Sequence, residues 1–334
     1  MTLGLWEILV EIQADSTSVR EHHYIVHPIP EYPRHFFGRN GGGAPCLLLG
    51  AVDQESVSHP PIQLEGLTVL FNIPCAISLP DGESREDRLS VVRCVVEGED
   101  TQRYFAHACE SVVQIVGSDP TDADIRQSVQ RLVEIFQRLS QPPVRSLTGL
   151  IGELCVIRLS RNPVAAIRSW RAEDSDRYDF ASQDVRIEVK ASTARERYHI
   201  LSLEQCAPPP GTIGILASLF IERLGGGKSM SELITEIERS VEDDPELILK
   251  LHRTIANSLG DALATAMATR FDFELARSSL QLYRIADIPA IRQPIPDGVS
   301  KVRFTSDLSI TPHASVRSLM KDNPTIGNLL PHET

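Results

Sequence analysis

Two carboxylates and one lysine could converge in the segment 177–190 of this 334-residue chain. Glu188 and Lys190 lie two positions apart in a stretch that alternates apolar and polar residues, so a strand would project both from one face. Asp179 precedes a turn-like Ala-Ser-Gln-Asp sequence. We therefore expect a hairpin that returns the carboxylate of Asp179 to the side of Glu188.

Neighbouring carboxylates repel each other, and a bound cation is the usual reason for a protein to place them together. Oxygen ligands suit Mg²⁺ or Mn²⁺, which bind through one or two carboxylates and a substrate phosphate. Lys190 shares a strand face with Glu188, so it could help to deprotonate a water molecule and neutralise charge on a phosphoryl oxygen. The pattern indicates metal-dependent hydrolysis of a phosphodiester bond.

A third acid, Glu153, precedes this pair on a predicted helix at residues 146–159. It lies at the edge of the apolar stripe of the helix, where its carboxylate could reach the buried side. The small residues Gly149 and Gly152 would let the helix approach a sheet closely. A solvated surface glutamate is the alternative interpretation of Glu153. The apolar stripe comprises Leu147, Leu150, Ile151, Leu154 and Ile157.

The first hundred residues predict a β-rich domain. Apolar or β-branched runs predict strands at 5–12, 46–52, 67–73 and 89–96, whereas the prolines between 28 and 33 and the glycines 41–43 predict loops. Helices are expected at 101–116 and at 119–141, where they would bridge to the next unit.

Further strands are predicted at 198–203 and 213–221, and Ser202 and Gln205 have the spacing of a capping box. The Gly-Gly-Gly-Lys-Ser stretch at 225–229 lacks the first glycine that a phosphate loop requires, so we expect a turn before a helix at 230–241. The expected elements that follow are helices beginning at 245 and 262, strands at 280–285 and 299–305, and a tail from 311 that frays or docks loosely.

Composition restricts the class of protein. The formal net charge of −12 argues against broad electrostatic binding of nucleic acid. Residues 158–197 nevertheless carry nine arginines and lysines against seven acids, a local net charge of +2 that favours an anionic partner. The six cysteines form no Cys-x-x-Cys pair, so neither a zinc site nor a disulfide framework is predicted. Because no apolar run approaches the roughly 20 residues that span a bilayer and no signal sequence is visible, we expect a cytoplasmic protein without membrane association.

The arrangement of Glu153 on a leading helix, Asp179 on a first hairpin strand and Ile-Glu-Val-Lys at 187–190 resembles the PD-(D/E)XK nuclease superfamily. Tyr178 replaces the proline of the superfamily's name, which is often absent from that position. The wider pattern is similar to a prokaryotic PD-(D/E)XK motif family found among restriction and phage-defence genes. The stretches that carry this similarity are Gly-Leu-Ile-Gly-Glu-Leu, Asp-Phe, Glu-Val-Lys-Ala-Ser and His-Ile-Leu-Ser-Leu-Glu-Gln.

The resemblance implies roles for individual residues. Lys190 would position the attacking water. His199 and Gln205 become candidates for phosphate contact or water positioning, and a strand-end histidine and a helix-cap glutamine are the alternative interpretations. The residues expected at Mg²⁺ or Mn²⁺ are Glu153 as an outside helper, Asp179, Glu188, and Val189 through its carbonyl oxygen.

The implied fold is α/β (α+β overall), with a restriction-endonuclease-like mixed sheet flanked by helices. The implied function is a Mg²⁺-dependent DNA endonuclease of a restriction or phage-defence system, acting as a homodimer or with other subunits such as an NTPase or a methyltransferase. Two alternatives stay open: a catalytically silent nuclease-fold scaffold or DNA-binding subunit of a defence complex, and an ordinary surface on which Asp179 and Glu188 point apart. The expected divisions are a β-rich domain at 1–100, a helical bridge at 101–143, a nuclease core at 144–222, helices and strands at 223–310, and a tail at 311–334.

Overall fold

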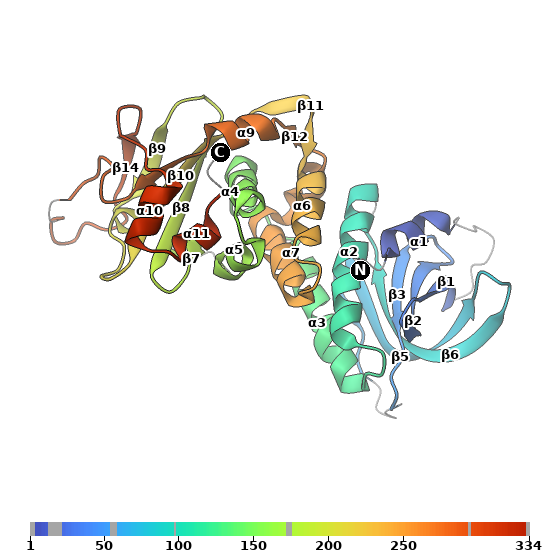
Figure 1. Ribbon diagram of the computed structural model, residues 1–334. Helices are drawn as coiled ribbons and strands as arrows, with labels where there is room; N and C mark the ends of the chain where they lie inside the picture. Colours follow the sequence, from blue (N-terminus) through green and yellow to red (C-terminus); the bar gives the residue numbers. More distant parts are fainter. Residues whose placement is uncertain are drawn as a thin grey trace. The chain divides into compact units, whose positions relative to one another are not determined.

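The computed structural model of the protein describes residues 4–12, 22–53, 59–96, 98–171, 176–292 and 295–331. The chain forms two compact units, residues 1–143 with 242–264 and residues 144–241 with 265–334 (Figure 1). Residues 242–264, which we expected in the C-terminal part, thus fold with the N-terminal unit. Each unit has its own sheet and its own helices.

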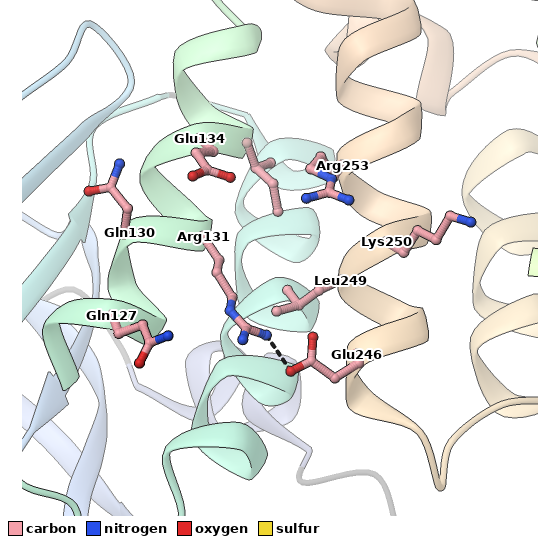
Figure 2. A pocket seen from close by; sticks show the side chains of 9 residues that line it. Gln127, Gln130, Arg131, Glu134, Glu246, Leu249, Lys250 and Arg253 are labelled. Carbon is pink, nitrogen blue, oxygen red and sulfur yellow. Dashed lines mark hydrogen bonds and ion pairs between the residues drawn. The ribbon is translucent and has the colours of Figure 1, made fainter. Parts of the chain in front are cut away.

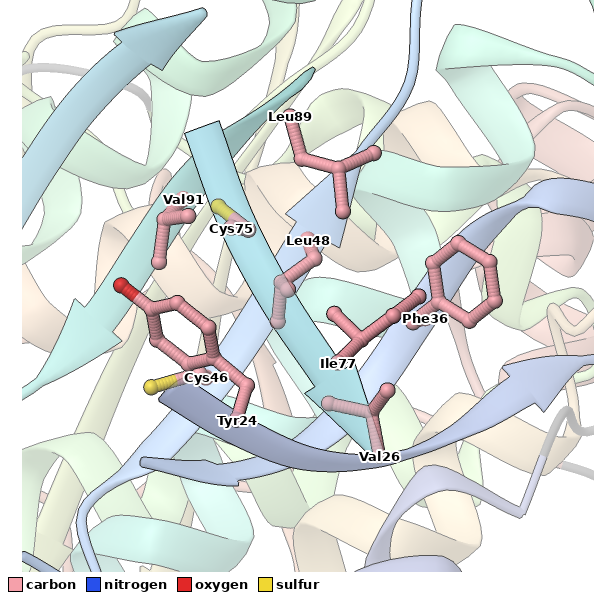
Figure 3. Packing of buried hydrophobic residues seen from close by; sticks show 9 residues of the cluster. All are labelled: Tyr24, Val26, Phe36, Cys46, Leu48, Cys75, Ile77, Leu89 and Val91. Atoms are coloured by element: carbon pink, nitrogen blue, oxygen red, sulfur yellow. The ribbon is translucent and has the colours of Figure 1, made fainter. Parts of the chain in front are cut away.

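The first unit is centred on a six-stranded sheet made of β1 (His23–Ile29), β2 (Tyr32–Asn40), β3 (Pro45–Leu49), β4 (Ile62–Gln63), β5 (Leu67–Ser78) and β6 (Ser84–Cys94). The strand order is β1-β2-β3-β6-β5-β4, and an additional parallel pairing of β1 with β5 closes the sheet on itself. Figure 3 shows apolar side chains that these strands bury, among them Tyr24, Phe36 and Leu89. The predicted β-rich region is confirmed.

Two local predictions in this unit were wrong. Residues 5–12, expected as a strand, form helix α1 (Leu5–Glu11), in which Leu5 and Leu9 are one helical turn apart and both fully buried. The segment with Pro28 and Pro33, expected as a loop, belongs to β1 and β2. The pairing of these strands is irregular next to Pro28, and a proline is tolerated where the sheet needs no N–H donor.

Three helices of the first unit pack on one another, namely α2 (Glu99–Val116), α3 (Asp122–Arg138) and α7 (Pro245–Leu259). A capping box between Thr121 and Asp124 begins α3. Between α3 and α7 a hollow of about 470 Å³ is lined by charged side chains, including Lys250 and the ion pair of Arg131 with Glu246 (Figure 2).

The second unit is built on a mixed four-stranded sheet in the order β13-β10-β8-β7, with β7 (Phe180–Ala181), β8 (Val185–Ser192), β10 (Ile213–Phe220) and β13 (Gln281–Arg284). The central strands β8 and β10 are parallel, and the edge strands are antiparallel to them. Helix α4 (Leu147–Leu159) packs on β8, and α9 (Phe273–Ser279) packs on β10 (Figure 1). This mixed sheet with flanking helices confirms the predicted fold class.

Two strand pairs supplement this sheet: β9 (Tyr198–Ser202) with β14 (Arg303–Asp307), and β11 (Arg223–Ser229) with β12 (Arg270–Phe271). The Gly-Gly-Gly-Lys-Ser stretch, expected as a turn, belongs to β11, but residues 224–227 bulge out of the pairing, because Arg223 and Lys228 both lie opposite Phe271. A Cβ atom on Gly227 would lie 2.2 Å from the carbonyl oxygen of Phe271, so glycine permits this close pairing. Ser229 still caps the helix α6 (Met230–Arg239).

Short helices complete the second unit: α5 (Pro163–Ser169), η1 (Glu204–Cys206), α8 (Leu263–Met267), α10 (Val316–Asp322) and α11 (Ile326–Leu329), whereas η2 (Gly260–Ala262) belongs to the first. The C-terminal tail is docked more firmly than its polar composition predicts. It buries Leu319, Ile326 and Leu330, and the N–H of Arg161 donates to the carbonyl of Leu330 at 3.0 Å. The burial of these few apolar residues is enough to dock the tail, although most of its residues are polar.

The six cysteines are free and buried, as their scattered positions predict. Burial raises the pKa of the Cys46 thiol to about 12, so this side chain behaves as a small apolar group. Across the parts of the chain that the structure describes, no helix has both the length and the apolarity needed to cross a bilayer.

Candidate active site

The hairpin of β7 and β8 sets the geometry of the candidate site. Phe180 pairs with Ile187, and the N–H of Ser182 closes the turn on the carbonyl of Val185 at 3.0 Å. Asp179 immediately precedes β7, and its Oδ2 accepts a hydrogen bond of 2.7 Å from the N–H of Val189. The carboxylate of Asp179 is thereby fixed beside the Glu-Val-Lys stretch of β8, as the sequence predicts.

The two oxygens of the Glu188 carboxylate have different surroundings. Oε1 lies 2.8 Å from Nζ of Lys190 and accepts a 2.5 Å hydrogen bond from Nε2 of Gln205. Oε2 is buried and has no hydrogen-bond partner among the residues that the structure describes. Burial, and then the negative charge of Asp179, raise the pKa of Glu188. One oxygen is therefore held in place and the other is available to a cation.

The helix α4 contributes Glu153, which is buried next to two side chains that the sequence analysis missed. Nε1 of Trp170 donates to its Oε2, and Nη2 of Arg171 donates to its Oε1, each at 2.7 Å. The Nη1 group of Arg171 forms an ion pair with Oδ1 of Asp179. Arg171 thus bridges the two acids, and both oxygens of Glu153 are occupied by protein donors.

Burial, and then the charge of Asp179, also raise the pKa of Glu153, whereas Arg171 and the Trp170 hydrogen bond act in the opposite direction. A second arginine, Arg145, is 3.7 Å from Asp179 and more exposed. No sequence motif singles out either arginine, because the segment contains several arginines at similar sequence separations from the acids. The one usable signal was that a buried pair of acids requires buried cations.

His199 and Gln205 both lie close to the hairpin, but in different roles. Gln205 accepts from the N–H of Ser202 through Oε1 and donates to Glu188 through Nε2, so it is a helix-cap partner and a site residue at once. His199 is hydrogen-bonded through Nε2 to the hydroxyl of Ser218 at 2.7 Å, and Ser218 is paired with Lys190 across β10 and β8.

The pKa of His199 is lowered to about 4 by burial and by the positive charges of Lys190 and Arg197. Arg197 donates to the same Ser218 hydroxyl at 2.7 Å. His199 is therefore neutral at physiological pH and supports the strand beside Lys190 rather than facing an open site.

The whole chain was also compared with known proteins. Residues 6–309 match the family described as "Putative PD-(D/E)XK family member, (DUF4420)". The chain belongs to this family. The match extends over both units, and it confirms the resemblance that Glu153, Asp179 and the Glu-Val-Lys stretch indicate. No curated protein and no solved structure matches the chain.

The residues of this PD-(D/E)XK family protein fit a hard divalent cation. The buried Oε2 of Glu188 lacks a partner, and leaving a buried carboxylate oxygen unpaired is costly. A residue in a strand directs its N–H and C=O to the same edge, so the carbonyl of Val189 faces Asp179, as its N–H does. Carboxylate and carbonyl oxygens form the donor set that Mg²⁺ prefers. Among the described residues no three acidic, histidine or cysteine side chains form a ligand cluster, so backbone, water or substrate oxygens would complete the coordination.

The hollow between α3 and α7 in the first unit differs from this site (Figure 2). Arg131 and Glu246 at its wall neutralise each other at 2.5 Å. The hairpin site instead gathers three groups with shifted pKa values, because burial raises the pKa of Glu153 and of Glu188 and lowers that of His199. Shifted titration of clustered groups marks functional sites, which favours the hairpin site.

Proposed function

We propose that this PD-(D/E)XK family protein is a metal-dependent endonuclease that hydrolyses phosphodiester bonds of DNA at Asp179, Glu188 and Lys190. Glu188 carries the proposal: one of its oxygens is held by Lys190 and Gln205, and the other is buried without a partner beside Asp179. PD-(D/E)XK folds are typically nucleases that use Mg²⁺ or Mn²⁺, so membership of the family supports the proposed chemistry.

Asp179, Glu188 and the carbonyl of Val189 would hold the cation, which when bound polarises phosphoryl oxygens and lowers the pKa of water. Gln205 and Lys190 fix Oε1 of Glu188, and this leaves Oε2 for the cation. The Nζ of Lys190 is partly exposed, so it can reach a substrate phosphate, stabilise negative charge on it and orient a water molecule. We assign His199 to the positioning of the Lys190 strand, because its Nε2 is occupied by Ser218.

The first prediction is that purified protein cuts plasmid DNA with Mg²⁺ or Mn²⁺ and does not cut it with EDTA. Glu188→Gln and Lys190→Met should each lower the cleavage rate by roughly 10²-fold or more, because each removes a charge that acts on the reacting phosphate. Initial rates on supercoiled plasmid, modified and unmodified, measure the effect. Lys321→Met is the matched control, because Lys321 is exposed and lies on α10, outside the α4, β7 and β8 elements that carry the site.

Cleavage that persists at the wild-type rate in Glu188→Gln would exclude this carboxylate from the reaction. Equal loss in Lys321→Met would show that the loss does not depend on the hairpin site.

A catalytically silent DNA-binding subunit is the second candidate function, and one observation favours it. Both oxygens of Glu153 and both of Asp179 already bind protein donors, which reduces what they can offer to a cation. Calorimetry distinguishes the two functions. A silent subunit would bind no Mn²⁺, and its binding of DNA would be the same in EDTA.

The proposal extends to the biological setting. The motif resemblance suggests restriction or phage defence in the cytoplasm, with DNA as substrate and with other subunits such as an NTPase or a methyltransferase as partners. One catalytic centre cuts one strand, so cleavage of both strands requires a homodimer or two successive events. The ratio of nicked to linear plasmid in the cleavage experiment separates these modes.

A further inference from the structure

We infer that Arg171 is a built-in cation that takes the place of a second metal ion, so that the active site binds one divalent cation per chain. This inference rests on the proposed function and specifies its metal requirement. Its basis is the geometry of one side chain, which the family motif does not include.

Arg171 lies between the two acids that are not on β8. Its guanidinium donates to Oε1 of Glu153 and pairs with Oδ1 of Asp179, and its side chain is only 3% exposed. The N–H of Arg171 also donates to the carbonyl of Asp179 at 2.9 Å, so backbone and side chain are both fixed to the hairpin. A planar guanidinium that binds two carboxylates has a permanent positive charge and a rigid position.

In two-metal hydrolases the ions lie about 3.5–4 Å apart and are held by shared carboxylates. Asp179 is the acid that could be shared in this site, because it lies between Glu188 and Glu153. Oδ2 of Asp179 accepts one hydrogen bond, from the N–H of Val189, and its second lone pair can bind the cation of the proposed function, whereas Oδ1 is paired with the guanidinium of Arg171. A second ion shared by Asp179 and Glu153 would therefore occupy the position of the guanidinium.

The charges of the site lead to the same conclusion. The fully buried members of the site are Glu153, Asp179, Glu188 and Arg171, whereas Lys190 and Arg145 are partly exposed at its edge. With the three acids ionised, the buried members carry −3 and +1, a net charge of −2. One divalent cation changes this to 0, but two would leave +2. An excess of unpaired buried charge is strongly unfavourable. Without Arg171 the buried charge is −3, which one divalent cation does not neutralise and which favours a second ion.

Trp170 strengthens the assignment of Glu153 as a positioning residue. Its indole N–H occupies Oε2 of Glu153, so the carboxylate has no free oxygen to direct at a metal ion. Trp170 is buried and pairs through its backbone with Phe180, which links this hydrogen bond to β7. Glu153 therefore holds Arg171, and Arg171 holds Asp179.

Counting bound Mn²⁺ tests the inference without any measurement of cleavage. The number of ions per chain is obtained by calorimetry and by the EPR signal of free Mn²⁺. We expect one ion in the wild type and two in Arg171→Met, which removes the charge at similar volume. The double variant Arg171→Met/Glu153→Gln should return to one ion, because it removes one of the two carboxylates that would hold the second. Arg171→Lys, which keeps the charge, should also bind one ion.

Arg145→Met is the matched control and should keep one ion, because Arg145 is 3.7 Å from Asp179 and more exposed. Two ions in the wild type would overturn the inference and leave the proposed nuclease intact. One ion or none in a folded Arg171→Met would overturn it as well, since Arg171 would then only orient Asp179. If Arg171→Met does not fold, two ions in Arg171→Lys or in the double variant would overturn it. No ion in the wild type would reject the proposed function itself.

Discussion

At the scale of single residues, the candidate site concentrates buried charge that the fold does not need. Glu153, Asp179 and Glu188 are all at least nine-tenths buried, and the positive charges of Arg171 and Lys190 compensate them only in part. Where the attraction of opposite charges does not fully offset the desolvation penalty of buried charges, the free energy of unfolding is lower. Such groups are retained when they perform chemistry, so a variant that loses activity should gain stability.

The pH dependence of stability tests this cost at Glu188. The pKa of Glu188 is raised from an ordinary 4.5 to about 8 in the folded protein. Between pH 4.5 and pH 8 the folded state therefore keeps a proton on Glu188 that the unfolded state releases. The stability contributed by this proton is fully present below pH 4.5 and is lost as the pH rises towards 8. In EDTA, the free energy of unfolding of Glu188→Gln should therefore decline less with rising pH than that of the wild type. At pH 9 it should be about 1–3 kcal/mol higher than that of the wild type.

Urea unfolding at pH 5 and pH 9 measures both quantities. Glu196→Gln is the matched control, because Glu196 is exposed and lies outside α4, β7 and β8. A Glu188→Gln variant that is less stable than the wild type at pH 9 would contradict the prediction.

At the scale of elements, the site depends on how closely α4 approaches β8. A Cβ atom on Gly152 would lie 2.9 Å from Cβ of Ala191 and 3.5 Å from side-chain atoms of Val189 and Leu219. The absence of a side chain at Gly152 therefore sets the separation of the helix from the sheet. Glu153 is the next residue of α4, so the same contact sets its distance from the hairpin.

A double-mutant cycle isolates this contact. Gly152→Ala should destabilise the protein in the wild-type background because of the clash with Ala191, although alanine is the better helix former. In the Ala191→Gly background the clash is absent, and the same change should stabilise by about 1 kcal/mol. The expected coupling is about 1–3 kcal/mol, obtained from four urea unfolding curves. A coupling near zero would mean that α4 has room to move away from the sheet.

At the scale of the whole molecule, the second unit is completed by the end of the chain. The tail contributes a bridge between Ser160 and Pro331, and the N–H of Asn162 donates to the carbonyl of Asn328 at 3.2 Å. These contacts fix the segment between α4 and α5, which follows the helix that carries Glu153. The tail is thus part of the scaffold of the site.

Replacing Leu330 by alanine tests the contribution of the tail. Leu330 is fully buried, so Leu330→Ala should lower the free energy of unfolding by about 2–5 kcal/mol. Ile310→Ala is the control, because Ile310 is 89% exposed and its replacement should have little effect. Thermal and urea unfolding give the difference. A neutral result for Leu330→Ala would mean that the second unit does not depend on its tail.

The sequence by itself determined the hairpin, the approximate bounds of α2, α3 and α4, and the convergence of Asp179 with the Glu-Val-Lys stretch. These features follow from local periodicity, which the chain carries whatever its distant contacts are. The spacing of Ser202 and Gln205 likewise predicted a capping box, and both reciprocal hydrogen bonds are present.

Only the tertiary structure decided the partners of the acids. Trp170 and Arg171 reach Glu153 through the packing of α4 on the sheet, and no local pattern shows which of several arginines is buried. The same reason explains why residues 242–264 join the first unit and why the tail docks: long-range burial outweighs local polarity. Sequence identified the residues able to bind a metal ion, and tertiary packing determined which of their oxygens remain open to one.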